Sequence, residues 1–527
     1  MDVIERAIKK NRHVSNYETM NSQTWNDFEK EAANKHIILA GIGATSYLIF
    51  ERTNLYNKIV GIYDQDGNKQ GIEGQFLIDI NPKIRCSLPK VKSFDAIDEL
   101  DPSDIVAVIG SSAQYEEIAE TLWNTGINST FVLLIMEANL RKTGLYDDSM
   151  KNDFYTYYLS EPIDGNKVLF QGYGPYSDHV RYIAEEMHRE HPEIEIVWVV
   201  NSFKEEIPKD FIQVLSSQKR RYAYEVETAK VIVYNHDVPV EVKKRIGQYH
   251  IHTKHWSSIT LKRFYLDSQY TTDQESDIVR WRKMFSELDY IFIGSDFDEE
   301  TARRGFDFHG KTVRVGSPRS DIMFLSREYK RIIKKRFLID SSKKIALYAP
   351  TYRFNKDNGI NRHLSAAPQM IDFNEVQQSL MKRFGGDWII LLRAHPAFAH
   401  LVREMEFLSY VINGSEYEDG EELCSACDIM ISDYSSIMFE TAYVNKPVFL
   451  YAPDREGYID NEYDLLIDYD SLPFPIAENN EQLAENILNF DQEKYKSDVK
   501  AFLEKYGVYE DGHASERAAE FILGLMG

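Results

Sequence analysis

Short apolar runs rich in β-branched residues recur along this chain, and a stretch long enough for a helix separates each run from the next. One series begins at HIILAGIGATSYLIFE (36–51), a second at KVLFQGYGPYSDHVRYIAEEM (167–187) and a third at KIALYAP (344–350). Strand-like runs that alternate with helix-length segments are typical of βαβ units on a parallel sheet. The pattern therefore predicts an α/β chain with three doubly wound units in succession.

The length of 527 residues agrees with three domains, or with two if one of them is large. The segment 138–159 is the predicted first hinge, and the charged helix near 326–342 is the second. We therefore expect domains over 1–145, 160–325 and 338–527.

Charge and cysteine content narrow the classes of function. Lys and Arg number 61 against 84 Asp and Glu, which gives a net charge of −23 and argues against a nucleic-acid partner. Three cysteines cannot form a disulfide framework, and MDVIERAIKKNRH lacks the apolar core of a signal peptide. The apolar runs, such as FVLLIM (131–136), which we expect to be strands, are too short to span a bilayer. We expect a cytosolic protein whose contact with a membrane, if it has one, is peripheral.

Ligand-binding residues are expected just after the strand-like runs, because open α/β sheets bind ligands beyond the carboxyl ends of their strands. In the third unit these positions hold arginines, a histidine and a hydroxyl-rich turn that enters the next helix. They are Thr351, Tyr352, Arg353, Arg393, His395, Ser432, Asp433, Ser435, Ser436, Asp454 and Arg455. Guanidinium groups match phosphate oxygens, and helix N-termini offer free N–H groups. The third unit is therefore predicted to bind a phosphate or diphosphate.

Seven ordered motifs carry a family resemblance. They are FQGYGPYSD (170–178), GSPRSD (316–321), LYAPTYR (347–353), RAHP (393–396), SDYSSIMFE (432–440), KPVFLYAPD (446–454) and REGYID…LPFP (455–475). In order and spacing they resemble the CDP-glycerol glycerophosphotransferase family of teichoic acid and capsule synthesis, over roughly 166–527.

The resemblance implies a GT-B-type pair of Rossmann-like domains, preceded here by an additional Rossmann-like N-terminal domain. It implies transfer of a polyol phosphate, glycerol phosphate first, from a CDP-polyol donor to an acceptor hydroxyl, with release of CMP. The expected acceptor is an anionic glycan or a lipid-linked chain, and the expected location is the cytoplasm at the inner face of the cell membrane. Neither a metal nor a cofactor is expected to take part.

The resemblance also assigns donor-binding residues. Arg393, His395, Ser435 and Ser436 are expected at the diphosphate, with Arg319 and Arg353 as supporting charge and with Asp433 and Thr351 in the same set at the strand ends. Taken alone, His395 is also interpreted as a strand-end histidine bonded to backbone. Within the set we prefer a role in the chemistry.

The acceptor hydroxyl needs a base, and the family places a histidine shortly before a Leu-Lys pair. Here the corresponding stretch is QYHIHTKHWSSITLKRF (248–264), in which His250, His252 and His255 compete. Counting back from Leu261–Lys262 favours His255, with His252 next. The alternative is that these histidines, with Lys254, Lys262 and Arg263, form only a basic surface for an anionic acceptor.

Three weaker signals each have two interpretations. GIGATS (41–46), with Asp64 about 20 residues later, imitates a dinucleotide fingerprint but lacks its third glycine, so a Rossmann-like loop that binds nothing is preferred over a cofactor site. Cys424 and Cys427 form a C-x-x-C without a second pair, so packing is favoured over zinc. The basic helix SREYKRIIKKRF (326–337) suits a polyanionic acceptor or lipid headgroups, or is a solvated face between domains.

Two other functions compete with the transferase. One is a GT-B glycosyltransferase that uses a nucleotide sugar, because a fold does not fix a chemistry. The other is a lapsed scaffold whose N-terminal unit senses a nucleotide. Intact RAHP and SDYSS motifs argue against the scaffold, whereas the altered histidine segment argues for it.

Overall fold

The protein is described by a computed structural model. It covers residues 20–527 apart from 21, 44, 47, 68, 73, 75–87, 112–113, 143–157, 173–175, 202–203, 217–218, 237–243, 268–274, 352–370, 396–401, 403–406 and 462–464. The chain divides into two compact units. One is Met1–Pro162 with Val214–Thr228, and the other is Ile163–Gln213 with Ala229–Gly527.

The first unit contains a five-stranded parallel sheet in the order β3-β2-β1-β4-β5. Its strands are β1 (His36–Ala40), β2 (Ile59–Tyr63), β3 (Val91–Lys92), β4 (Ile105–Ile109) and β5 (Thr130–Val132). Its helices include α3 (Trp25–Ala32), α4 (Leu48–Arg52), α5 (Tyr115–Asn124) and α6 (Leu133–Lys142), with 3₁₀ turns η1 (Leu55–Lys58), η3 (Phe94–Glu99) and η4 (Pro102–Asp104).

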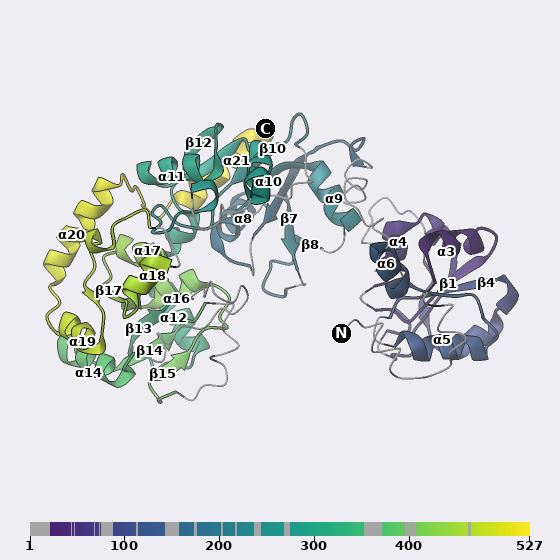
Figure 1. Cartoon of the computed structure of the whole chain (residues 1–527), viewed down its shortest axis with the longest axis horizontal. Helices are drawn as coiled ribbons and strands as arrows, with labels where there is room; N and C mark the ends of the chain where they lie inside the picture. Colours follow the sequence, from purple (N-terminus) through teal and green to yellow (C-terminus); the bar gives the residue numbers. More distant parts are fainter. Residues whose placement is uncertain are drawn as a thin grey trace. The chain divides into compact units, whose positions relative to one another are not determined.

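Helices cover both faces of this sheet, because successive strand residues point to opposite sides. Ile37 and Leu39 pack with α3, α4 and α6, whereas Ile38 and Ala40 pack with α5. Figure 1 shows α5 on the opposite side of the strands from α3, α4 and α6. The apolar run FVLLIM, expected as strand, divides between β5 and the start of α6. Its strand part and Leu133 and Met136 of α6 are buried, which is why the whole run is apolar.

The next sheet along the chain has the order β12-β11-β10-β9-β6-β7-β8. It belongs to the second unit except for the end of β8, which, like the helix after it, falls in the Val214–Thr228 segment of the first unit. Its strands are β6 (Asp164–Gln171), β7 (Glu195–Val200), β8 (Ile212–Leu215), β9 (Ala229–Tyr234), β10 (Tyr249–His252), β11 (Tyr290–Ile293) and β12 (Lys311–Arg314). The intervening helices are α8 (Asp178–Glu190), α9 (Lys219–Thr228), α10 (Glu275–Ser286) and α11 (Asp296–Phe306), with η5 (Tyr265–Asp267) and η6 (Pro318–Leu325). Helix α12 (Ser326–Arg336) then leads to the next sheet.

The third sheet is parallel and six-stranded, in the order β15-β14-β13-β16-β17-β18. Its strands are β13 (Lys344–Ala349), β14 (Trp388–Leu392), β15 (Val411–Asn413), β16 (Ile429–Ser432), β17 (Val448–Tyr451) and β18 (Ile476–Ala477). Its helices are α14 (Phe373–Phe384), α16 (Gly420–Ala426), α17 (Ile437–Tyr443), α18 (Arg455–Asn461), α19 (Asn480–Leu488) and α20 (Gln492–Lys505), with η9 (Tyr469–Ser471).

The last helix, α21 (Ala514–Met526), leaves the third sheet and packs against α8, β9 and η6 of the preceding one. Figure 1 shows it in yellow among the teal elements of that part of the chain. Three sheets of the predicted type are therefore present, which confirms the α/β prediction. The residue boundaries 1–145, 160–325 and 338–527 stay a prediction.

Candidate functional site

Three neighbouring strands bring the predicted donor residues to one edge of the third sheet. β13 lies between β14 and β16, and all three run parallel. Thr351 follows β13, Arg393 and His395 follow β14, and Asp433 and the two serines follow β16. The sequence prediction that these residues share one edge is therefore met for those that the structure describes. Arg353 lies outside the described residues.

Asp433 holds the start of the neighbouring loop. Its side chain is buried, and Oδ1 accepts hydrogen bonds from the N–H of Thr351 at 2.8 Å and from its hydroxyl at 2.6 Å. Oδ1 also accepts from the N–H of Tyr434. These contacts tie the end of β13 to the end of β16, so Asp433 positions the edge on which a donor is expected.

Ser436 connects this edge to the histidine segment of the preceding sheet. Its Oγ lies 3.2 Å from Oγ1 of Thr260 and accepts from the N–H of Leu261 at 3.3 Å. A main-chain hydrogen bond joins the same two parts of the molecule: the N–H of Leu466 donates to the carbonyl of Leu261 at 2.8 Å. Ser435 and Ser436 are both half-buried just before α17. The hydroxyl-rich turn therefore lies where the two sheets of this unit meet.

Arg393 supports the loop before α16. Its guanidinium donates to the carbonyl of Tyr417 at 2.5 Å and to that of Glu418 at 3.5 Å, and it packs beside Gly420. His395 is exposed at the same strand end. Contact of either residue with a diphosphate stays a prediction.

The same loop is held from the other side by α8. Asp419 is the N-cap of α16, and its Oδ2 accepts from Arg181 Nη1 at 2.9 Å and from the Tyr182 hydroxyl at 2.8 Å. Lys204 pairs with Glu418 at 2.6 Å. The 417–420 loop is thus fixed by both halves of the unit.

Arg319 is enclosed by carboxylates and a carbonyl. Nη1 lies 3.2 Å from Asp178 Oδ1, 2.9 Å from the carbonyl of His255 and 3.6 Å from Glu421, and Nη2 lies 2.5 Å from Glu440 Oε1. Burial raises the pKa of both glutamates, and Arg319 opposes the rise. With these contacts, Arg319 binds protein groups on both Nη atoms, which does not favour the expected role as supporting charge for a phosphate.

His252 is a buried structural histidine. Its Nδ1 accepts from the N–H of Lys254 at 2.9 Å, so the proton resides on Nε2, which lies 2.8 Å from the carbonyl of His236. Phe285 and Phe306 pack against the ring. Both nitrogens are therefore engaged, and the geometry favours a packing role over proton transfer.

His250 is also in the core. It packs against Tyr234, and its Nε2 lies 3.4 Å from Gln248 Oε1. Burial, with Lys244 nearby, lowers the pKa of His250 to about 3. The ring is fully buried beside Tyr234 of the neighbouring strand β9.

His255 is half-buried, whereas His250 and His252 are fully buried. Like Nδ1 of His250, its Nδ1 is buried and has no hydrogen-bond partner within the part of the chain that the structure describes. Its ring lies beside His236, Trp256 and Phe264 at centroid distances of 5.1–5.4 Å. Burial, with a smaller effect of His236, lowers the pKa of His255 to about 3. The imidazole is therefore neutral and has an unused nitrogen.

Lys254 cannot contribute to the basic surface that was the alternative interpretation of the histidine segment. This residue is buried and pairs with Asp298 at 2.6 Å, and Asp298 also accepts from the Trp256 indole N–H at 3.0 Å. Arg263 pairs with Asp267, and Lys262 lies over the Tyr458 ring. The pair at Asp298 anchors the main chain on both sides of His255.

The GIGATS loop of the first unit is bound to its own neighbours. Asp64 Oδ2 accepts from the N–H of Ile42 at 2.7 Å and from Lys69, and the Thr45 hydroxyl donates to the carbonyl of Gly110. A Cβ on Gly43 would lie 2.9 Å from the Gly110 carbonyl oxygen. The glycine and the acidic residue therefore serve loop packing, which agrees with the preferred interpretation that this loop binds no dinucleotide.

Cys424 and Cys427 are buried free thiols at the end of α16, and burial raises the pKa of both. Within the described residues no group of three His, Cys, Asp or Glu side chains is placed to hold a metal ion. The packing interpretation of the C-x-x-C agrees with this geometry.

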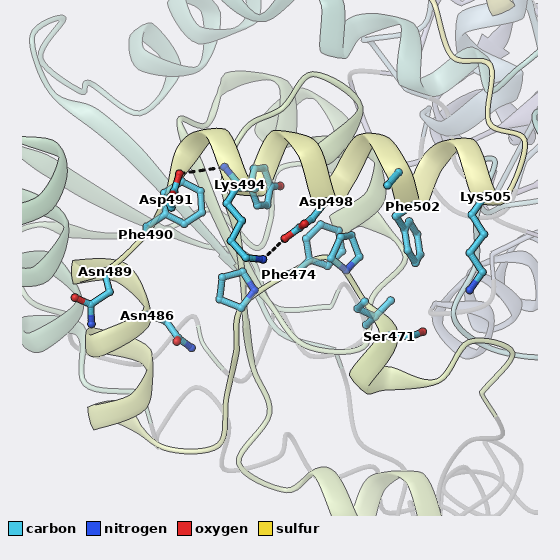
Figure 2. A pocket seen from close by; sticks show the side chains of 15 residues that line it. Ser471, Phe474, Asn486, Asn489, Phe490, Asp491, Lys494, Asp498, Phe502 and Lys505 are labelled. Atoms are coloured by element: carbon cyan, nitrogen blue, oxygen red, sulfur yellow. Dashed lines mark hydrogen bonds and ion pairs between the residues drawn. The ribbon is translucent and has the colours of Figure 1, made fainter.

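A pocket of about 630 Å³ lies elsewhere on the third sheet, between α20 and the 471–475 segment. Figure 2 shows Lys494 directed toward Asp498 on the same helix, with Phe474 and Phe502 nearby. The pocket lining contains none of the predicted donor residues. It is therefore separate from the candidate site.

Sequence reasoning did not single out Asp178, Glu421 and Glu440 as functional, although all three surround Arg319. A signal was present for Glu440, which stands four residues after Ser436 and therefore on the same face of α17. Asp178 ends the FQGYGPYSD motif. Neither spacing nor motif indicates that both contact one arginine.

Comparison with known proteins now decides the family. A family model described as CDP-glycerol:poly(glycerophosphate) glycerophosphotransferase matches residues 153–524. The chain belongs to this family. The resemblance drawn from the seven motifs is confirmed, and the match leaves most of the first unit outside it.

Named glycerophosphotransferase relatives agree. The teichoic acid poly(glycerol phosphate) polymerase of Bacillus subtilis (strain 168) is 26% identical over 68% of this chain and 49% of its own length. The teichoic acid glycerol-phosphate transferase of Staphylococcus aureus (strain NCTC 8325 / PS 47) is 26% identical over 71% of this chain and 97% of its own. The chain therefore spans about half the length of the first relative and nearly all of the second.

A solved structure confirms the fold of the glycerophosphotransferase part. The wall teichoic acid polymerase TagF matches with a TM-score of 0.63 at 24% identity, over 74% of this chain and 96% of that one. This likeness confirms the predicted GT-B-type pair of Rossmann-like sheets. Of the helices that the structure describes, none has the length and apolar character needed to cross a membrane.

Proposed function

We propose that the chain transfers glycerol phosphate from CDP-glycerol to an acceptor hydroxyl and releases CMP, in the synthesis of a teichoic acid or capsule polymer. The observation that carries this proposal is the contact of Thr260 and Leu261 with Ser436 of the predicted phosphate-binding turn. His255 lies on the same short segment as Thr260 and Leu261, after β10 of the other sheet. Family membership supplies the substrate class.

The chemistry needs no covalent enzyme intermediate. The acceptor oxygen attacks the phosphorus that bears glycerol, and the bond from that phosphorus to the bridging oxygen breaks. CMP leaves with the electron pair of that bond, and the proton of the acceptor hydroxyl passes to the base. Positioning and charge stabilisation are what the protein must supply for such a transfer.

Each part of this reaction has a proposed residue. Arg393, His395 and the two serines hold the diphosphate, while His255 Nδ1 takes the proton. A pKa of about 3 makes free His255 a weak base, since efficient bases have a pKa near the operating pH. The negative charge of a bound diphosphate favours the imidazolium and so raises that pKa in the complex.

The test is CMP release from CDP-glycerol in the presence of a glycerol-phosphate primed acceptor. CDP-ribitol and UDP-sugars are run in parallel, together with the thermal midpoint in each nucleotide. Stabilisation and turnover with CDP-glycerol support the proposal. Turnover with a UDP-sugar alone would identify a glycosyltransferase, and stabilisation without turnover would identify a binding protein.

We further propose that the enzyme works in the cytoplasm and touches the inner face of the membrane through α12. Lys330 pairs with Asp428 and Lys334 donates to a carbonyl, but Arg327, Arg331 and Lys335 are exposed. Exposed apolar side chains accompany them, at Phe324, Leu325, Ile332 and Leu338. Basic and apolar groups together favour an anionic lipid surface.

Sedimentation with phosphatidylglycerol vesicles tests this contact. R331E/K335E should lose binding, whereas K496E/K500E, which makes the same charge change on α20, should keep it. Equal vesicle binding by both variants and wild type would contradict the membrane contact and indicate that α12 only faces solvent.

A further inference from the structure

The start of α17 is connected to the histidine segment at two points, once directly and once through Arg319. Ser436, just before the helix, contacts Thr260 and Leu261. One turn later, Glu440 accepts from Nη2 of Arg319, and Nη1 of the same guanidinium donates to the carbonyl of His255. The serine turn and His255 are therefore connected through a single planar side chain.

This guanidinium is fixed from several directions. Arg319 as a residue is 7% exposed, and Asp178 at the start of α8 and Glu421 of α16 also face its guanidinium. Asp178 is itself held by the amide of Asn235 at 2.9 Å. A planar fork with several donors can satisfy acceptors in different directions at once, which an ammonium on a flexible stem does poorly.

We propose that Arg319 is a positioning residue that sets the place of His255 relative to the donor-binding turn. It acts through the His255 carbonyl and Glu440 and does not touch the donor. The inference rests on the proposed function, because the position of His255 matters to rate only if this histidine meets the acceptor. A displacement of about 1 Å in such a group can cost on the order of 100-fold in rate.

The removal of Arg319 has a second effect that must be separated from the first. A buried carboxylate that loses its partner destabilises the fold. We therefore compare R319M with R319M/E440Q, in which an amide replaces Glu440, the carboxylate that lies nearest to the guanidinium. The double variant is expected to regain most of the thermal midpoint lost by R319M, while kcat stays at least 100-fold below wild type. Affinity for CDP-glycerol by calorimetry should change less than threefold.

Arg181 supplies the matched control. It also joins the two halves of the unit, since it contacts Asp419 and Glu422 of α16, but these contacts do not involve the His255 segment. R181M is expected to lower the thermal midpoint as R319M does and to keep kcat within about fivefold of wild type.

Hydrogen exchange of the 253–262 amides gives a readout that does not depend on the substrate. R319M/E440Q should exchange at least tenfold faster in this segment, and R181M should not. Recovery of kcat together with stability in the double variant, or unchanged exchange, would overturn the positioning role. Loss of affinity for CDP-glycerol with kcat retained would instead indicate that Arg319 binds the donor phosphate. If wild type releases no CMP, the proposed function fails, and the exchange result still decides whether Arg319 holds the segment.

Discussion

Lys254 and Asp298 form a fully buried ion pair, with Nζ 2.6 Å from Oδ2. Asp298 lies in the first turn of α11 and also accepts from the N–H of Gly294 and the indole of Trp256. Lys254 has a positive φ of 65°, a conformation that costs energy in a residue other than glycine. The pair therefore holds a strained turn next to His255.

Removal of one partner of this pair is expected to destabilise the protein strongly. K254M leaves a buried carboxylate without its cation, so the free energy of unfolding should fall by about 3–5 kcal/mol. K254M/D298N should recover part of the loss. Urea unfolding followed by tryptophan fluorescence measures both.

The exposed pair of Lys494 and Asp498 on α20 is the control. K494M should cost less than about 1 kcal/mol, because water screens such pairs. Equal losses in K254M and K494M would contradict a special role for the buried pair.

Arg393 should matter to donor affinity. R393A removes a guanidinium from the predicted diphosphate site, and truncation of one partner of a desolvated charge pair costs roughly 2–5 kcal/mol. Calorimetry with CDP-glycerol measures the loss. K204M disturbs the same loop through Glu418 but leaves Arg393 in place, so it should bind donor normally. Unchanged affinity in R393A would restrict Arg393 to supporting the 417–420 loop.

Motif order was enough to predict which residues gather at the edge of the third sheet. Thr351, Arg393 and Ser435 follow β13, β14 and β16, which the structure places side by side, with β13 at the point where the strand order reverses. The environment of Arg319 was not predictable in the same way. Its acceptors come from α8, α16 and α17, and no local pattern encodes a contact among separate elements.

The histidines show the same limit. Spacing before Leu261–Lys262 favoured His255, but only the structure shows that β10 ends at His252 and that both nitrogens of that ring are bonded. FVLLIM was assigned to strand because a buried strand and a buried helix start have the same composition. Local hydrophobicity does not distinguish them.

Glu510 should make stability depend on pH. Burial raises its pKa to about 8, although hydrogen bonds from Ser258 and from the N–H of Ser317 lower it. The pKa is higher in the folded state than the unfolded value near 4.5. The stabilisation that comes with the bound proton is therefore complete below pH 4.5 and disappears as the pH rises through 8.

E510Q tests this dependence. The variant should lose less stability than wild type between pH 5 and pH 8.5, because an amide does not ionise. Thermal midpoints across that range measure the difference. Parallel pH profiles of the two proteins would show that Glu510 does not titrate in this way.

Loss of His255 should reduce rate without loss of donor. A general base contributes about 10²–10⁴-fold, so H255A should lower the rate of CMP release by that factor and leave CDP-glycerol affinity nearly unchanged. H252A should instead lower stability, since it removes a ring that bonds at both nitrogens. A collapse of activity in H252A with full activity in H255A would transfer the role to His252.

The pH profile separates the free enzyme from its donor complex. His255 must be unprotonated to act as a base, so activity is lost as the pH falls through its pKa. That pKa is about 3 in the free protein, because burial and the nearby His236 disfavour the imidazolium. We therefore expect kcat/KM to show no decrease due to this histidine from pH 8 down to pH 5, whereas kcat should decrease at a higher pH, since the diphosphate raises the pKa in the complex. Initial rates at limiting CDP-glycerol measure kcat/KM at each pH, and initial rates at saturating CDP-glycerol measure kcat. A decrease in kcat/KM centred near 6.5, absent in H255A, would show that His255 has an ordinary environment in the free enzyme.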